Sequence, residues 1–80
     1  MNGAIFQAAR DAGCTRAEAE VLAWYVEVDT LREAAYRIGI SEGNAQNHAS
    51  RARRRLNAPH LAAAIHRLHE AIRAQVPLAS

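Results

Sequence analysis

Residues 30–56 read TLREAAYRIGISEGNAQNHASRARRRL, and they predict two helices joined by a very short turn. Thr30 is a typical helix N-cap with a glutamate three residues later, and this pattern indicates a capping box. Gly39 is expected to end this helix as a left-handed cap, and Ser41 to cap the next one. Only Gly39 and Ile40 separate the two helices, so we expect them to meet at a sharp angle rather than as an antiparallel hairpin.

The second of these helices, residues 41–56, has two different faces. At about 100° per residue, one stripe is entirely apolar and is expected to be buried. The opposite face is polar, with amides and hydroxyls in the first two turns and arginines in the last two. The apolar stripe consists of Ala45, Ala49, Ala52 and Leu56, and the polar face of Asn47, Ser50 and Arg54, flanked by Asn44, Gln46 and Arg51.

This order of side chains suits a helix that lies against nucleic acid. Amide side chains can pair with the edge of adenine, and serine can bond to either type of base. Arginines suit phosphates or guanine and carry the salt-dependent part of the affinity. The alternative is a solvated helix end whose arginines only favour the helix dipole. Arg53 and Arg55, which flank the apolar stripe, are interpreted as plain surface residues.

The rest of the chain also predicts helices, so the expected fold class is all-α. Residues 2–12 form a short amphipathic helix closed by Gly13, and a capping box at Thr15 opens the next helix. Pro59 suits the first turn of a long last helix over residues 59–76. We therefore expect a short N-terminal helical extension, residues 1–13, and one compact domain, residues 14–80.

The composition favours a small intracellular protein with an uneven charge. Residues 1–40 carry four arginines against six acids, whereas residues 41–80 carry six arginines against two acids, as in a polyanion binder. The single cysteine, Cys14, excludes an internal disulfide. No apolar run approaches the ~20 residues that cross a bilayer, and no signal-peptide layout is present. We expect a cytoplasmic, nucleoid-associated protein without membrane contact.

The sequence predicts neither an enzyme nor a metal site. No serine, cysteine or carboxylate pair has a catalytic neighbour pattern. His60, His66 and His69 are near one another in the chain, but they lack a cysteine or acidic ligand at suitable spacing and are interpreted as solvated. We predict no cofactor and no small-molecule ligand.

Together the motifs resemble the helix-turn-helix domain of LuxR-type (GerE-like) bacterial transcriptional regulators over roughly residues 14–70. The matching residues are Thr15-x-x-Glu18-x-Glu20-Val21-Leu22, then Glu33-x-Ala35-x-Arg37-Ile38-Gly39-Ile40-Ser41-Glu42-Gly43, then Asn47-His48, Leu56 and Ala64-Ile65. The resemblance implies a four-helix DNA-binding domain that dimerises through its last helix.

The resemblance also implies which residues contact double-stranded DNA. The positions that match base contacts are Gln46, Asn47 and Ser50, and those that match phosphate contacts are Arg32, Asn44, Arg51 and Arg54. The family usually has Thr-Val-Lys where this chain has Asn44-Ala45-Gln46. One basic contact is therefore lost, and the target sequence is not predicted.

The last helix carries an apolar seam at alternating spacings of four and three residues, formed by Leu61, Ile65, Leu68, Ile72 and Val76. For Leu61 and Ile65, packing on the domain's own core is a sufficient explanation. The later residues are expected to extend past so small a core, which predicts a homodimer seam. A dimer would hold two recognition helices about one DNA turn, ~34 Å, apart.

The short turn, the sorted polar face and the resemblance lead to the main hypothesis of a stand-alone, homodimeric transcriptional regulator. We expect no built-in signal input, since no receiver or ligand-binding domain is seen ahead of residue 14. A second resemblance leaves an alternative open. Residues 50–56, Ser-Arg-Ala-Arg-Arg-Arg-Leu, are similar to the end of region four in sigma factors, which binds promoters and RNA polymerase. The alternative is therefore an adaptor that binds RNA polymerase or another regulator.

Overall fold

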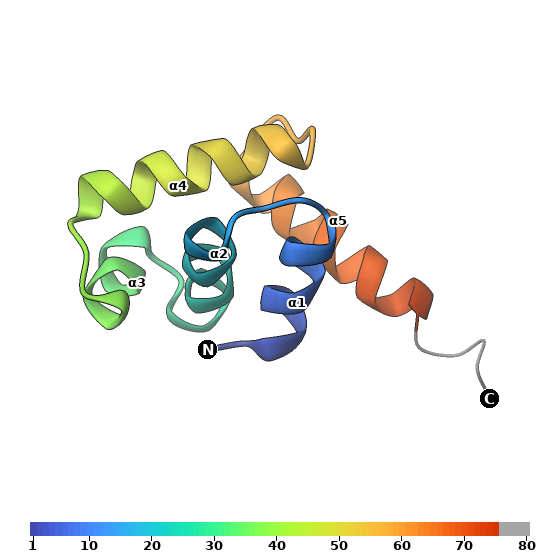
Figure 1. Ribbon diagram of the computed structural model, residues 1–80, viewed down its shortest axis with the longest axis horizontal. Helices are drawn as coiled ribbons and strands as arrows, with labels where there is room; N and C mark the ends of the chain where they lie inside the picture. The colour runs from blue at the N-terminus through green and yellow to red at the C-terminus, as the bar shows by residue number, and fades with distance from the viewer. Residues whose placement is uncertain (76–80) are drawn as a thin grey trace.

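The computed structural model describes residues 1–75, and within them it shows five α-helices. They are α1 (Gly3–Asp11), α2 (Arg16–Val28), α3 (Leu31–Ile38), α4 (Glu42–Arg55) and α5 (Leu61–Gln75). Every regular element in this part of the chain is helical, which confirms the all-α prediction with its short additional N-terminal helix. Figure 1 shows α2 in the middle, α4 across one edge, and α1 beside α5.

Polar caps fix the starts of α2 and α3. The Thr15 hydroxyl accepts from the Glu18 N–H at 3.2 Å, and the Glu18 carboxylate accepts from the Thr15 N–H at 2.9 Å, which completes a capping box. Thr30 accepts from the Glu33 N–H at 3.1 Å, but the Glu33 carboxylate accepts from Arg37 at 3.5 Å. The prediction of a second capping box is therefore wrong for the bond from the Thr30 N–H to the Glu33 carboxylate. The helix α3 still begins where the sequence predicts.

The turn between α3 and α4 is as short as the sequence predicts. Gly39 adopts a left-handed φ of +86°, and its N–H donates to the Ala35 carbonyl at 2.8 Å. Ser41 then caps α4, because its hydroxyl accepts from the Asn44 N–H at 3.1 Å. Both helices contact α2, so α2 supports the whole helix-turn-helix unit.

The core consists of two buried clusters that meet beneath α4. One joins α2, α3 and the first half of α4 through Val21, Ala35, Ala45 and Ala49. The other joins α2, the second half of α4, α1 and α5, and its buried members are Ile5, Ala9, Cys14, Ala19, Leu22, Ala23, Ala52 and Leu68. The apolar stripe predicted for α4 thus lies in both clusters, with Leu56 partly buried at its end.

Part of the apolar seam of α5 packs within the domain, which corrects the prediction at Leu68. Leu68 is 1 % exposed and belongs to the same buried cluster as Ile5 of α1. Ile65 and Ile72 are partly buried against that cluster, as is Leu61. The expectation was wrong for Leu68 because α1 enlarges the core and packs against α5. For the other seam residues, a role in a dimer stays a prediction. Val76, the last residue predicted for the seam, lies outside the described residues.

The start of α5 also differs from the prediction. Pro59 lies in the bend before the helix, which begins at Leu61. His60 takes the capping role, since its Nδ1 accepts from the Ala63 N–H at 3.2 Å and its carbonyl accepts from the Ala64 N–H at 3.1 Å. No helix within residues 1–75 is long and apolar enough to cross a membrane.

Candidate nucleic-acid interface

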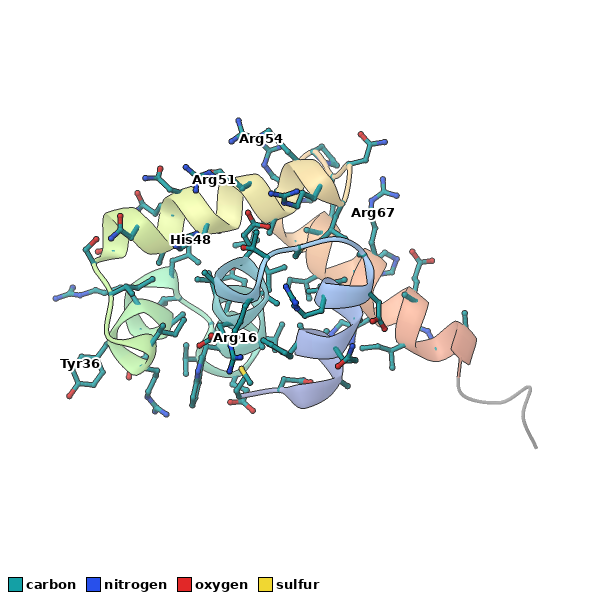
Figure 2. All side chains as sticks on the ribbon, viewed as in Figure 1. Arg16, Tyr36, His48, Arg51, Arg54 and Arg67 are labelled. Carbon is teal, nitrogen blue, oxygen red and sulfur yellow. The ribbon has the colours of Figure 1, made fainter. Side chains whose placement is uncertain are left out.

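The inner side of α4 is built almost entirely from methyl groups. Ala45 and Ala52 are fully buried and Ala49 is nearly so. Because alanine side chains are short, the axis of α4 lies close to the helices below, and its outer side remains uncovered along its length. His48 lies on the inner side in Figure 2, with its Nδ1 shielded from solvent and without a hydrogen-bond partner among the described residues.

The outer side of α4 carries the polar residues that the sequence singled out. Gln46, Asn47 and Ser50 are exposed, as are Asn44, Arg51 and Arg54. Figure 2 shows Arg51 and Arg54 directed away from the body of the domain. Within residues 1–75, neither arginine forms an ion pair with an acidic side chain. Their charge is therefore available to a phosphate.

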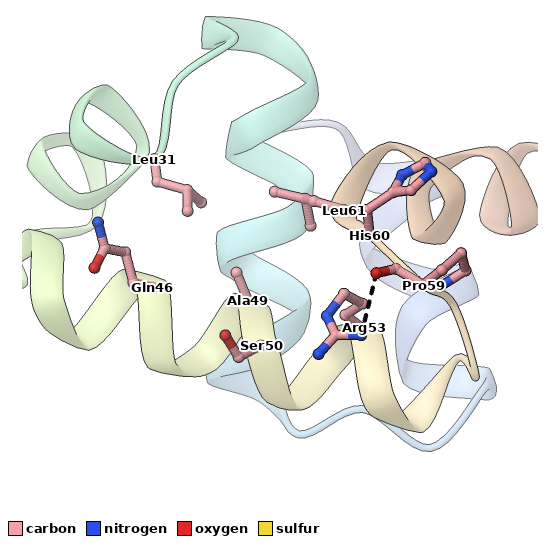
Figure 3. Close-up of a pocket in the computed structure, with 8 residues that line it drawn as sticks. All are labelled: Leu31, Gln46, Ala49, Ser50, Arg53, Pro59, His60 and Leu61. Carbon is pink, nitrogen blue, oxygen red and sulfur yellow. Dashed lines mark hydrogen bonds between the residues drawn. The ribbon is translucent and has the colours of Figure 1, made fainter.

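Two of the predicted base contacts, Gln46 and Ser50, also line an open hollow of about 530 Å³ beside α4. Figure 3 shows the hollow between the start of α3, one flank of α4 and the start of α5. Asn47 lies further round the helix, by about 100° from Gln46. The outer surface of α4 thus has a hollowed flank and an open centre, and the candidate base contacts are divided between them.

Arg53 borders the same hollow, and it is not a plain surface residue. Its Nη1 donates to the Ala58 carbonyl at 2.9 Å. It also donates to the Pro59 carbonyl at 3.5 Å, the bond that Figure 3 marks with a dashed line. These bonds attach the end of α4 to the connection that leads into α5. The interpretation of Arg53 as plain surface was wrong because the sequence does not show where that connection folds back.

Arg55 was also interpreted as plain surface, and that interpretation was wrong too. Its Nε donates to Glu18 Oε1 at 2.7 Å, across 37 positions of sequence. Glu18 is a buried acid, whereas the sequence predicted for it only a capping box and a match to the family motif. The single available signal was a carboxylate in the first turn of a helix with an apolar inner face.

The same ion pair lies close to the buried Cys14 thiol. Burial raises the pKa of this thiol, the Glu18 carboxylate adds to the rise, and the Arg55 guanidinium opposes it.

The remaining predicted contacts lie on two different helices. Asn44 is exposed in the first turn of α4, and Arg32 is exposed in the first turn of α3. The described residues of the predicted dimer seam, Leu61, Ile65, Leu68 and Ile72, lie on α5, and of these Leu61 reaches the hollow. In the described part of the chain, no group of three or more histidine, cysteine or acidic side chains is arranged to hold a metal ion.

Comparison with known proteins agrees with this arrangement of helices. The GerE model, which describes bacterial regulatory proteins of the luxR family, matches residues 14–68. No curated protein and no solved structure matches the chain significantly. The match covers well over half of the chain and includes α2, α3, α4 and the first half of α5. The chain therefore belongs to the luxR family of bacterial regulatory proteins, whose helix-turn-helix domains bind DNA to regulate transcription.

Proposed function

We propose that this chain is a sequence-specific DNA-binding regulator of transcription that places α4 in the major groove of double-stranded DNA. The observation that carries the proposal is the outer side of α4, where amides and a hydroxyl precede two exposed arginines that form no ion pair within residues 1–75. The major groove is ~12 Å wide and admits one α-helix, and it shows a distinct donor and acceptor pattern for each base pair. The uncovered side of α4 fits that space.

The proposed roles follow the chemistry of each side chain. Gln46, Asn47 and Ser50 would contact bases, because amides and hydroxyls can recognise base edges. The residues proposed to contact phosphates are Arg32, Asn44, Arg51 and Arg54. Such contacts fix the position of the protein on the duplex without reading sequence. We expect this function to be exercised in the cytoplasm, on the nucleoid.

We further propose that the protein acts as a homodimer, through residues other than Leu68. A shallow hollow of about 290 Å³ lies between α2 and α5 and is lined by Tyr25, Val26, Asp29, Ala62, Ile65 and His69. Apolar side chains thus remain accessible at one edge of α5, next to the partly buried Leu61 and Ile72.

Sedimentation equilibrium of the chain and of the variant Ile65→Glu would test the proposed homodimer. An unchanged dimer fraction in the variant would contradict it. Action as a stand-alone regulator stays a prediction.

Selection from random duplexes tests the main proposal. The chain should enrich one sequence, and the triple variant Asn47→Ala, Ser50→Ala, Arg54→Ala should lose at least about 30-fold in affinity for it, since its two lost base contacts cost about 1–3 kcal/mol each. Loss of the Arg54 phosphate contact should add to this. Arg16→Ala with Arg73→Ala is the matched control, because it removes two exposed arginines from other helices. Full binding by the triple variant would contradict the proposal.

The adaptor function has one observation in its favour. Tyr36 on α3 is 78 % exposed, and exposed tyrosines are frequent at the centres of protein interfaces. The salt dependence of binding to random duplex distinguishes the two functions. A steep loss of affinity with rising salt supports contact between several arginines and phosphates, whereas no measurable binding at low salt supports an adaptor for RNA polymerase or another regulator.

A further inference from the structure

Glu18 is the one charged side chain that is buried within residues 1–75, and two bonds hold its carboxylate in place. It is 1 % exposed, and its Oε1 accepts from the Thr15 N–H at 2.9 Å and from Arg55 Nε at 2.7 Å. A buried carboxylate without partners is strongly unfavourable, so the bond from Arg55 is required rather than incidental. Since the capping box fixes Glu18 on α2, the carboxylate is a stationary anchor.

Arg55 is the last residue of α4, so this bond attaches the end of α4 to the start of α2. The other contacts beneath α4 come mainly from alanine methyl groups, which pack without a preferred direction. A charge-assisted hydrogen bond is directional and short. The ion pair therefore opposes sliding and rolling of α4 more strongly than the methyl contacts do.

A small change in the pose of α4 is large on the scale of base recognition. A helix of 14 residues is about 21 Å long, so a tilt of about 5° around one end moves the other by about 2 Å. Hydrogen-bond lengths vary over only about 0.5 Å. Asn47 and Ser50 can therefore read bases only if both ends of α4 are fixed.

The arginines of α4 occupy different parts of its exposed arc. Measured from Ala45 at about 100° per residue, Arg53 lies near 80° and Arg55 near 280°, at the two edges of that arc. Both donate to atoms of their own chain. Arg54 near 180° and Arg51 near 240° lie between them and point outwards. The edges of the arc are thus used to attach the helix.

We propose that Arg55 is a positioning residue for DNA recognition, which sets the pose of α4 through its ion pair with Glu18 and does not act by contacting a phosphate. This inference rests on the proposed DNA-binding function. The competing role is a phosphate contact, because the Arg55 side chain is 45 % exposed. The two roles differ in how substitutions at Glu18 affect binding, since Glu18 is too buried to touch DNA.

The test compares affinities for the selected duplex and for random duplex, each over a range of salt concentrations, under conditions where circular dichroism shows every variant folded. Arg55→Gln should lower the ratio of the two affinities about tenfold and leave the salt slope on random duplex unchanged. A phosphate contact would instead lower that slope by about 0.9 with little change in the ratio. If the unaltered chain selects no sequence, the proposed function fails before this comparison begins.

Two further variants separate positioning from phosphate contact. Glu18→Gln should lower the ratio about as much as Arg55→Gln, whereas release of the Arg55 charge towards DNA would raise both affinities. The double variant Glu18→Gln, Arg55→Gln should recover most of the lost ratio, because two amides can bond to each other without charge. No recovery, together with a reduced salt slope, would overturn the proposal. If Arg55→Gln does not fold, Arg55→Lys replaces it: positioning predicts a lowered ratio, and phosphate contact an unchanged one.

Discussion

Ile5 and Leu68 come from opposite ends of the chain, and both are essentially inaccessible within one buried cluster. Leu68→Ala should therefore destabilise the domain by about 3 kcal/mol, through lost apolar burial and the cavity left behind. Urea unfolding should give the same loss at protein concentrations about a hundredfold apart, because the contacts lie within one chain. A loss confined to high protein concentration would instead restore Leu68 to a dimer seam.

The outward arginines of α4 should dominate the electrostatics of DNA binding. Replacing Arg51 and Arg54 by alanine should lower the slope of log affinity against log salt by about 1.8, at ~0.9 per phosphate contact. Filter binding or fluorescence anisotropy with random duplex measures this slope. Arg16→Ala with Arg73→Ala removes the same number of charges elsewhere, and an equal change in that control would show that net charge alone is responsible.

Gly39 should be replaceable only at a conformational cost. A Cβ there would meet no atom within 4 Å, so Gly39→Ala is penalised by its left-handed φ of +86° alone, at about 1–2 kcal/mol. Gly43 is the matched control, since its Cβ would likewise meet nothing within 4 Å but its φ is helical. Gly43→Ala should be neutral or stabilise by up to about 1 kcal/mol in thermal unfolding. Equal effects at the two positions would contradict the assigned turn.

Cys14 should make stability fall in alkaline solution. Burial, with a further contribution from the Glu18 carboxylate, raises the pKa of the thiol in the folded protein, despite the opposing Arg55. Its contribution to stability is then fully present below the unfolded pKa of about 8.5 and decreases as the pH rises above it. Urea unfolding between about pH 7 and 10 measures this slope. Cys14→Ala should reduce it, and an unchanged slope would mean that other groups cause the loss.

The local features of this fold could be predicted from the sequence, and the contacts between distant segments could not. The caps at Thr15 and Ser41 and the turn at Gly39 depend on neighbours within three or four residues, so their patterns are visible in the chain. The inner stripe of α4 follows from helical spacing in the same way. For these elements the structure agrees with the predictions.

The predictions failed where spacing shows a face but not what covers it. The stripe that contains Leu68 suits a second chain or the protein's own α1 equally well, and only the fold shows that α1 packs there. Arg53 and Arg55 resemble solvated charges until the positions of Ala58 and Glu18 are known. A basic run in a sequence therefore does not show which of its arginines bind within the chain and which are available to DNA.

The alanine inner side of α4 separates the demands of folding from those of target choice. Substitutions at Gln46, Asn47 or Ser50 alter exposed atoms only, and the buried methyl groups beneath them need no compensating change. Gene duplicates of such a domain can diverge in the promoters they occupy while drifting almost neutrally in stability. For the same reason, libraries randomised at these three positions should retain mostly folded members, which makes this small domain a practical starting point for proteins with new DNA targets.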